Sequence, residues 1–116
     1  MYSNDPHMMT VRKDAEFWCR KGAEHMHQGD YSNSLMFFDK AISIYPNLVT
    51  AWENKAKCLD DMEQYSQAIS CYDQAIQIDP GNSEIWYNKS ISHLKLGQQH
   101  EAESCARTAI DLAMGE

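Results

Sequence analysis

The chain has 116 residues, of which 43% are hydrophobic and 23% are charged, a composition typical of one soluble globular domain. Its formal net charge is −7, and no segment is strongly basic. The chain therefore lacks the basic patch with which proteins usually bind nucleic acids or anionic membranes. No apolar run approaches the length of a bilayer span, and no signal-peptide pattern follows the N-terminus, so we expect a cytoplasmic protein.

We treat residues 1–14 as an N-terminal extension. The opening MYSNDPHMM has no hydrophobic periodicity. One interpretation of its His-Met pair is the remnant of a cloning site ahead of a native start at Met8 or Met9. We therefore leave this opening out of the fold prediction.

From residue 15 onward the sequence repeats itself every 34 residues. YSNSLMFFDKAISIYP begins at Tyr31, and the related stretch YSQAISCYDQAIQIDP begins at Tyr65. The same offset aligns three further sets, which are Trp18, Trp52 and Trp86; Ala41, Ala75 and Ala109; Ile42, Ile76 and Ile110. The sequence therefore predicts one domain, 15–116, made of three units at 15–48, 49–82 and 83–116.

Each unit contains two stretches of helical length. In the first stretch, apolar or small residues recur at spacings of four and three, as in Trp52, Ala56 and Leu59, which places them on one face of a helix. Short turns separate the two stretches, at 28–30, 62–64 and 96–98.

The ends of the second stretches are marked by proline. Pro46 and the DPGN segment at 79–82 end the second helices of the first two units. Asn47 and Asn82 are the expected N-caps of the helices that follow. The chain is therefore expected to be all-α, with six helices and no strand.

These residues resemble the tetratricopeptide repeat (TPR) family, whose signature places Trp, Gly, Tyr, Ala, an aromatic residue, Ala and Pro over 34 residues. The middle unit matches it at Trp52, Ala56, Tyr65, Ala68, Tyr72, Ala75 and Pro80. The first unit matches at Trp18, Gly22, Gly29, Tyr31, Phe38, Ala41 and Pro46, and the third keeps Trp86, Gly97, Ala102 and Ala109. The resemblance implies antiparallel helix pairs stacked into a right-handed superhelix, whose first helices line a concave groove.

The third unit departs from this pattern. Gln99, Glu103 and Ala106 stand where the other units have Tyr, Leu or Ile, and an aromatic residue. A polar last helix is expected at the end of an array, because no further unit covers it. The alternative is self-association through Ile110 and Met114, together with Leu112, if they remain uncovered.

The sequence contains no recognisable catalytic constellation, so we expect a non-enzymatic protein without a cofactor. His25 and His27 lie two residues apart on a helix, about 200° from each other, so they cannot share a metal ion. His25 and His93 occupy inward-facing places and are predicted core residues. The four cysteines are expected to be reduced, because Cys71 and Cys105 occupy equivalent places in adjacent repeats, too far apart for a disulfide.

A second stripe on each first helix lies about 110° from the stripe that packs within the pair. In the family, this stripe faces the groove. Its members are Glu84, Tyr87, Ile91 and Leu94 in the third unit; Thr50, Glu53, Lys57 and Asp60 in the second; Glu16, Cys19, Ala23 and Met26 in the first. The alternative is that Ile91 and Leu94 pack only against a neighbouring helix.

One TPR subgroup, the co-chaperones, grips a C-terminal carboxylate with Lys, Asn, Asn, Lys and Arg. The corresponding places here hold Cys19, Ala23, Asn54, Glu84 and Asn88. Only Asn54 agrees with that pattern, and the cations that would offset the desolvation of a carboxylate are missing. We therefore expect no carboxylate-clamp activity.

We predict a protein–protein interaction scaffold that holds a partner's peptide or helix, apolar with a basic residue, and binds neither nucleic acid nor membrane. In this prediction Tyr87, Ile91 and Leu94 form the anchor pocket, Asn54 and Asn88 bind ligand backbone, and Glu53 and Asp60 select against acidic ligands. The alternative is a structural subunit that forms a homodimer or larger assembly.

Overall fold

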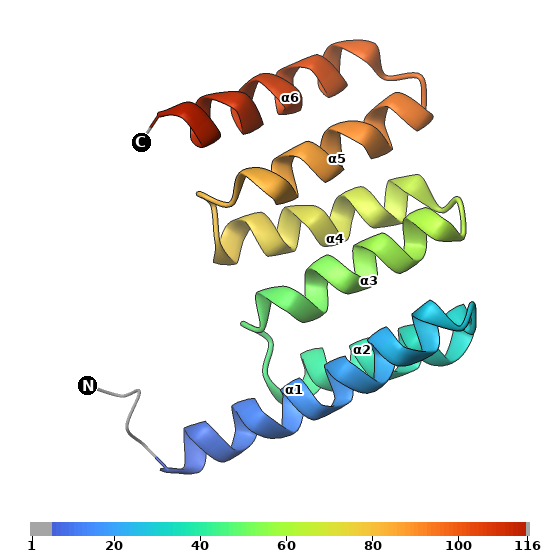
Figure 1. Ribbon diagram of the computed structural model, residues 1–116, viewed down its shortest axis with the longest axis vertical. Helices are drawn as coiled ribbons and strands as arrows, with labels where there is room; N and C mark the ends of the chain where they lie inside the picture. Colours follow the sequence, from blue (N-terminus) through green and yellow to red (C-terminus); the bar gives the residue numbers. More distant parts are fainter. Residues whose placement is uncertain (1–5, 116) are drawn as a thin grey trace.

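The computed structural model describes residues 6–115, which form six α-helices and, within that range, no strand. The helices are α1 (Pro6–His27), α2 (Tyr31–Ile44), α3 (Val49–Asp61), α4 (Tyr65–Ile78), α5 (Ser83–Lys95) and α6 (Gln99–Met114). They stack along the longest axis of the molecule as three antiparallel pairs (Figure 1). The predicted all-α architecture and number of helices are confirmed. None of these helices is long and apolar enough to cross a membrane.

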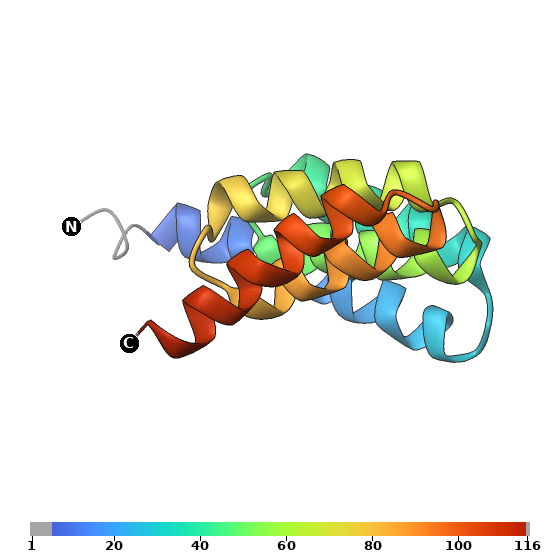
Figure 2. The ribbon, with the colours of Figure 1, turned by 90° about the horizontal axis from the view of Figure 1, so that it is seen from above.

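The first helix of each pair lies in one layer of the stack. Figure 2 shows α1, α3 and α5 on one side and α2 and α4 on the other. Small residues on the first helices allow this close pairing. A Cβ on Gly22 would lie 2.5 Å from Cε1 of Phe38, so the aromatic ring of α2 fills the place of a side chain on α1. Ala56 and Ser90, at the equivalent places in α3 and α5, are also buried.

The start of α1 differs from the prediction. The helix begins at Pro6, a residue suited to the first turn because that turn needs no donor from its N–H groups. Residues 6–14, which were predicted to be an extension outside the repeat domain, therefore form the N-terminal part of the first helix. The rest of that predicted extension, residues 1–5, lies outside the described residues.

The predicted turns within the three units occur at equivalent positions. Each contains a residue with positive φ, which is 79° at Gly29, 63° at Glu63 and 76° at Gly97. Glycine adopts this left-handed conformation without steric cost, whereas a residue with a Cβ does not. The middle unit therefore carries backbone strain that the other two avoid.

One of the two predicted N-caps is correct. The Asn82 side chain accepts a hydrogen bond from the backbone N–H of Glu84 at the start of α5, over 3.1 Å. The prediction for Asn47 is wrong, because α3 is preceded by Leu48, which makes no side-chain cap. Leu48 is instead buried in the core, so its apolar contacts fix the entry to α3 in place of a capping oxygen.

The junctions between units repeat with the same 34-residue spacing. Trp52 Nε1 donates to the carbonyl of Pro46 over 2.8 Å, and Trp86 Nε1 donates to the carbonyl of Pro80 over 3.0 Å. Each indole thus links its own helix to the proline that follows the second helix of the preceding unit. An ion pair adds a second link at each junction, Lys55 Nζ to Asp39 Oδ1 at 2.7 Å and Lys89 Nζ to Asp73 Oδ1 at 2.6 Å.

The last helix leaves part of its apolar surface in solvent. Ile110 is 57% exposed and Met114 is 78% exposed, whereas Leu112 is half-buried. Ile42 and Ile76, which are equivalent to Ile110, pack against the two core clusters. The exposed face of α6 is therefore the face that a following helix covers in the first two units.

Candidate partner-binding groove

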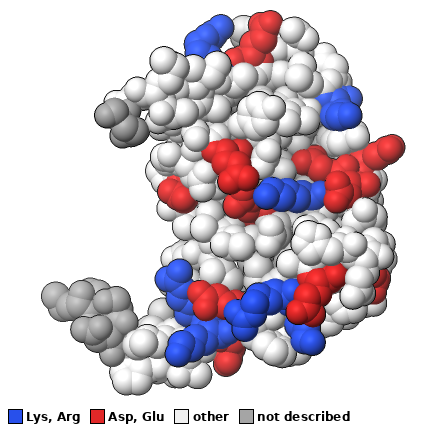
Figure 3. Space-filling view, in the orientation of Figure 1, with Lys and Arg blue, Asp and Glu red and all other residues white. Residues whose placement is uncertain are grey.

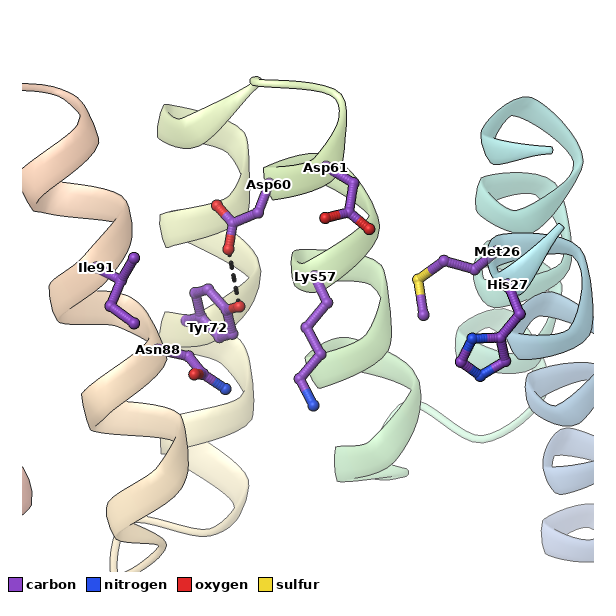
Figure 4. A pocket seen from close by; sticks show the side chains of 8 residues that line it. All are labelled: Met26, His27, Lys57, Asp60, Asp61, Tyr72, Asn88 and Ile91. Carbon is purple, nitrogen blue, oxygen red and sulfur yellow. Dashed lines mark hydrogen bonds between the residues drawn. The ribbon is translucent and has the colours of Figure 1, made fainter. Parts of the chain in front are cut away.

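A hollow of about 370 Å³ opens between the first helices of the three units. We call it the central hollow, and it is lined by Met26 and His27 of α1; Lys57, Asp60 and Asp61 of α3; Tyr72 of α4; Asn88 and Ile91 of α5. In Figure 4, Met26 and His27 lie on one side of the hollow and Ile91 lies on the opposite side, with the α3 side chains between them. One surface therefore brings together residues more than 60 positions apart in the sequence.

A hydrogen-bonded network fixes the floor of the central hollow. The two carboxylate oxygens of Asp60 accept hydrogen bonds from different helices, Oδ2 from the Tyr72 hydroxyl at 2.9 Å and Oδ1 from the Ser92 hydroxyl at 2.8 Å (Figure 4 draws the Tyr72 bond). Burial raises the pKa of the Asp60 carboxyl, and the bonds from Ser92 and Tyr72 oppose that rise. Asp60 thus joins α3 to α4 and α5, and the hollow is preformed.

Asp60 was predicted to face the groove, but its hydrogen bonds to Tyr72 and Ser92 were not predicted. Tyr72 occupies the aromatic position of the repeat, where the first unit has Phe38. A buried tyrosine hydroxyl needs a hydrogen-bond partner, so the exchange of Phe for Tyr was a signal that a polar group lies nearby. The third member, Ser92, gave no comparable signal.

Lys57 lies between two acidic residues at the edge of the central hollow. Its Nζ is 3.7 Å from Glu53 Oε2 and 3.8 Å from Glu84 Oε2, distances at which ions attract but do not form hydrogen bonds. The Glu53 side chain is only 14% exposed, and its Oε2 makes no hydrogen bond within the described part of the chain. Burial consequently raises the pKa of the Glu53 carboxyl.

A second hollow, of about 230 Å³, lies along α1 and α3 before the central hollow. We call it the basic hollow, and it is lined by Arg12, Glu16, Cys19, Arg20, Ala23, Leu48, Thr50 and Asn54. The two hollows follow each other, because Ala23 and Asn54 precede Met26 and Lys57 by one helical turn on α1 and α3. Figure 3 shows basic side chains gathered over α1 and acidic ones prominent in the middle of the stack.

The two arginines of the basic hollow were not predicted. Arg12 pairs with Glu16, with Nε 3.2 Å from Oε2, whereas Arg20 has no ion pair among the described residues. Arg12 fell in the stretch treated as an extension, and only the earlier start of α1 places it one turn before Glu16 on the helix. Asn54 is engaged here, because its Nδ2 lies 3.8 Å from the Cys19 sulfur.

A third hollow, of about 380 Å³, lies at the far end of the stack. We call it the terminal hollow, and it is lined by Ser83, Glu84, Tyr87, Ala106, Ala109, Ile110 and Ala113. The predicted site residues are therefore distributed. Lys57, Asp60, Asn88 and Ile91 line the central hollow, Asn54 lines the basic hollow, and Glu84 and Tyr87 line the terminal hollow; Leu94 is exposed.

The predicted core histidines are half-buried and bond across the turns of their own units. His25 Nδ1 lies 3.0 Å from Asp30 Oδ2, and His93 Nδ1 lies 2.6 Å from Gln98 Oε1. Hydrogen bonds from Asn33 and then His25 lower the pKa of Asp30. These histidines therefore stabilise the turns between the two helices of their units and do not belong to the buried core.

The cysteines offer little nucleophilic chemistry. All four are buried as free thiols, and desolvation raises the pKa of each, to about 11 for Cys58. A thiolate is the reactive form of cysteine, so these thiols behave as small apolar side chains. Over residues 6–115, no group of three His, Cys, Asp or Glu side chains is placed to hold a metal ion.

The sequence matches two family models described as tetratricopeptide repeat, one at residues 15–48 and 49–82 and another at 71–104. A related sequence, an uncharacterized protein of Methanocaldococcus jannaschii, is 43% identical over 47 residues, which are 40% of this chain and 55% of that protein.

Solved structures share the fold. The crystal structure of MamA is similar with a TM-score of 0.85 and 19% identity, covering 87% of this chain and 59% of that chain. The second TPR of Spaghetti (RPAP3), bound to the HSP90 peptide SRMEEVD, gives 0.84 and 19%, covering 91% and 98%. A CopN–Scc3 complex gives 0.85 and 23%, covering 90% and 61%. At these identities the similarity concerns the fold alone, and this chain spans little more than half of the M. jannaschii protein and of MamA.

Proposed function

Because the chain belongs to the tetratricopeptide repeat family, we propose that it is a protein–protein interaction module that holds a peptide or helix of a partner protein in the groove formed by α1, α3 and α5. The observation that carries this proposal is the central hollow, which is lined by residues from all three first helices. Structures with the same fold include a TPR bound to a peptide and the CopN–Scc3 complex.

The central hollow suits a ligand with an apolar anchor. Met26 and Ile91 are half-buried on its opposite sides, so an apolar side chain inserted between them would bury surface on both. The Asp60 network holds three of the surrounding helices in place before a ligand arrives. A preformed site loses less conformational entropy on binding than a mobile one.

The charges favour a basic residue next to that anchor. Asp61 is exposed at the rim, and Lys57 is already shared between Glu53 and Glu84. A ligand Lys or Arg would gain attraction from the acidic groups, whereas a ligand carboxylate would be repelled. The Asn88 side-chain amide makes no hydrogen bond among the described residues and is available to ligand backbone.

The same charges argue against a two-carboxylate clamp. The five clamp places carry no Lys or Arg, and in the basic hollow only Arg20 lacks an ion pair among the described residues. One exposed arginine gives little to offset the desolvation of two carboxylates. We therefore propose that the chain does not act as a carboxylate-clamp co-chaperone. The proposal as a whole is a non-catalytic scaffold in the cytoplasm.

The test is an affinity capture with four forms of the full chain. Wild type is compared with the double variant Met26→Ala/Ile91→Ala, which removes the apolar side chains on both sides of the central hollow. The other two forms are Tyr87→Ala in the terminal hollow and Ser66→Ala on the exposed surface of α4. We expect a partner that wild type and Ser66→Ala retain and that the double variant loses. Equal capture by all folded forms, or recovery only of proteins with acidic C-termini, would contradict the proposal.

A second candidate function is a structural subunit that self-associates through α6. The exposure of Ile110 and Met114 favours it, because monomeric proteins seldom leave large apolar side chains grouped in solvent. A molar mass that rises with concentration, and no longer does so after Ile110→Glu, would support this candidate.

A further inference from the structure

The terminal hollow occupies the place of an interior contact. In the first unit, Ala15, Cys19, Phe38 and Ala41 form a core cluster with Leu48, which directly precedes α3, and with Ala51 in the first turn of α3. The third-unit equivalents of those four residues are Ser83, Tyr87, Ala106 and Ala109, all of which line the terminal hollow. The hollow is thus the surface on which apolar residues of a following helix would pack.

The outer face of α6 differs from the earlier second helices in charge. Asp39 and Asp73 each pair with a lysine on the next helix, at 2.7 and 2.6 Å. The equivalent residue of α6 is Arg107, which is exposed and has no ion pair among the described residues. A helix docked on α6 with the same geometry would therefore place its lysine against an arginine.

The two internal junctions define what such a helix must carry. On α3 and α5, a fully buried apolar residue precedes the paired lysine by four positions, Ala51 before Lys55 and Ile85 before Lys89. Residues at this spacing lie on one face of a helix. Opposite Arg107, the charge that fits the lysine position is negative.

We propose that the outer face of α6 docks an amphipathic helix of a partner protein that carries a large apolar residue and, four residues later, Asp or Glu. The apolar residue sits in the terminal hollow, where Ala106 replaces the aromatic Phe38 and Tyr72 and leaves room for a larger side chain. The acid pairs with Arg107.

The same charge excludes a second copy in regular head-to-tail stacking. The first helix of another copy would offer Phe17, equivalent to Ala51 and 44% exposed, as the apolar residue. Four residues later it carries Lys21, which would face Arg107. Like charges brought together at an interface oppose association, so Arg107 selects an acidic partner helix over the protein's own α1.

The test uses α1 as a surrogate partner, because Lys21→Glu gives it the predicted pattern of a large apolar residue followed by an acid. We expect wild type to remain monomeric and Lys21→Glu to associate head-to-tail at least about tenfold more strongly, as measured by sedimentation equilibrium. Arg107→Asp is expected to associate as well, by pairing with Lys21. The double variant Lys21→Glu/Arg107→Asp again opposes like charges and should be monomeric.

Two controls separate docking from misfolding. Circular dichroism must show unchanged helicity in all four forms, and Phe17→Ala in the Lys21→Glu background should abolish association by removing the apolar residue. The proposal is overturned if the folded single variants stay monomeric at millimolar concentration, or if their association survives Phe17→Ala. It is also overturned if wild type associates as strongly as the variants, since a second copy would then occupy the face.

Discussion

The α4–α5 junction and the outer face of α6 are built from equivalent sequence positions, and three of the differences between them change side-chain size or charge. On α4, Tyr72 shares a core cluster with Ile85 of α5 and Asp73 pairs with Lys89 of α5, with Ile69 one helical turn before Asp73; the equivalent residues of α6 are Ala106, Arg107 and Glu103. The covered face thus keeps a large aromatic residue and the acid that pairs with the next unit. At these positions α6 therefore differs from α4 by both a loss of side-chain volume and a reversal of charge.

The largest expected effect comes from removing the aromatic residue where it is covered. Tyr72 is almost fully buried and bonds to Asp60, so Tyr72→Ala should lower the free energy of unfolding by about 3–5 kcal/mol. The reverse exchange at the open end, Ala106→Tyr, should change it by less than about 0.5 kcal/mol. Urea unfolding followed by circular dichroism measures both, and comparable losses would remove the distinction between the two faces.

The ion pair sharpens the same comparison at smaller magnitude. Lys89 is mostly buried against Asp73 and lies over the Trp86 ring, so Lys89→Ala should cost about 1 kcal/mol of unfolding free energy. Lys21, the equivalent residue on α1, has no ion pair among the described residues. Lys21→Ala should be neutral within about 0.5 kcal/mol. A larger cost at Lys21 than at Lys89 would contradict the assignment of the junction.

The turns allow a comparison between the middle unit and its neighbours. Glu63 has the positive φ that glycine adopts at positions 29 and 97, so Glu63→Gly should relieve strain. After the entropy that glycine loses on folding, we expect a gain of about 0.5–1 kcal/mol. Gln64, in the same turn and at the N-cap of α4, has a negative φ of −98°, so Gln64→Gly has no such strain to relieve and should give no comparable gain. Thermal unfolding distinguishes the two, and a loss at Glu63→Gly would show that its backbone is not strained.

The smallest expected effect is a pH dependence at Glu53, the residue equivalent to the more exposed Tyr87. Burial raises the pKa of Glu53 above its unfolded value, so its stabilising contribution is complete below the unfolded pKa and declines as pH rises through the folded pKa. Relative to Glu53→Gln, wild type should therefore gain stability on acidification from pH 7 toward pH 4.5. Melting temperatures of both proteins across this range measure the difference, and parallel curves would contradict it.

Periodicity was sufficient to predict the six helices, the three turns and the unit spacing, because the 34-residue repeat fixes which positions face the core. It failed where tertiary contacts override a local signal. Asn47 has the chemistry of an N-cap, but burial of Leu48 sets the start of α3. Residues 6–14 lack periodicity because little packs against them, although they are helical.

The groove was predictable as a surface but not as individual hollows. The repeat places Asn54 and Asn88 at equivalent positions. Asn54 nevertheless lines the basic hollow and Asn88 the central hollow, because the preceding first helix is α1 for Asn54 and α3 for Asn88, and these two helices carry different side chains. Tyr87 and Ile91 are one turn apart but line different hollows. Helical spacing gives the direction of a side chain, whereas the neighbour that it meets depends on packing across units.

The indole bonds at the junctions have a consequence for spectroscopy. Trp52 and Trp86 each report on one boundary between units, through their bonds to Pro46 and Pro80, while Trp18 stacks on Phe37 inside the first unit. Replacing two of the three tryptophans at a time would leave one fluorophore per location. Because each unit of such an array contacts only its neighbours, the emission of these single-tryptophan proteins would resolve the order in which the units detach.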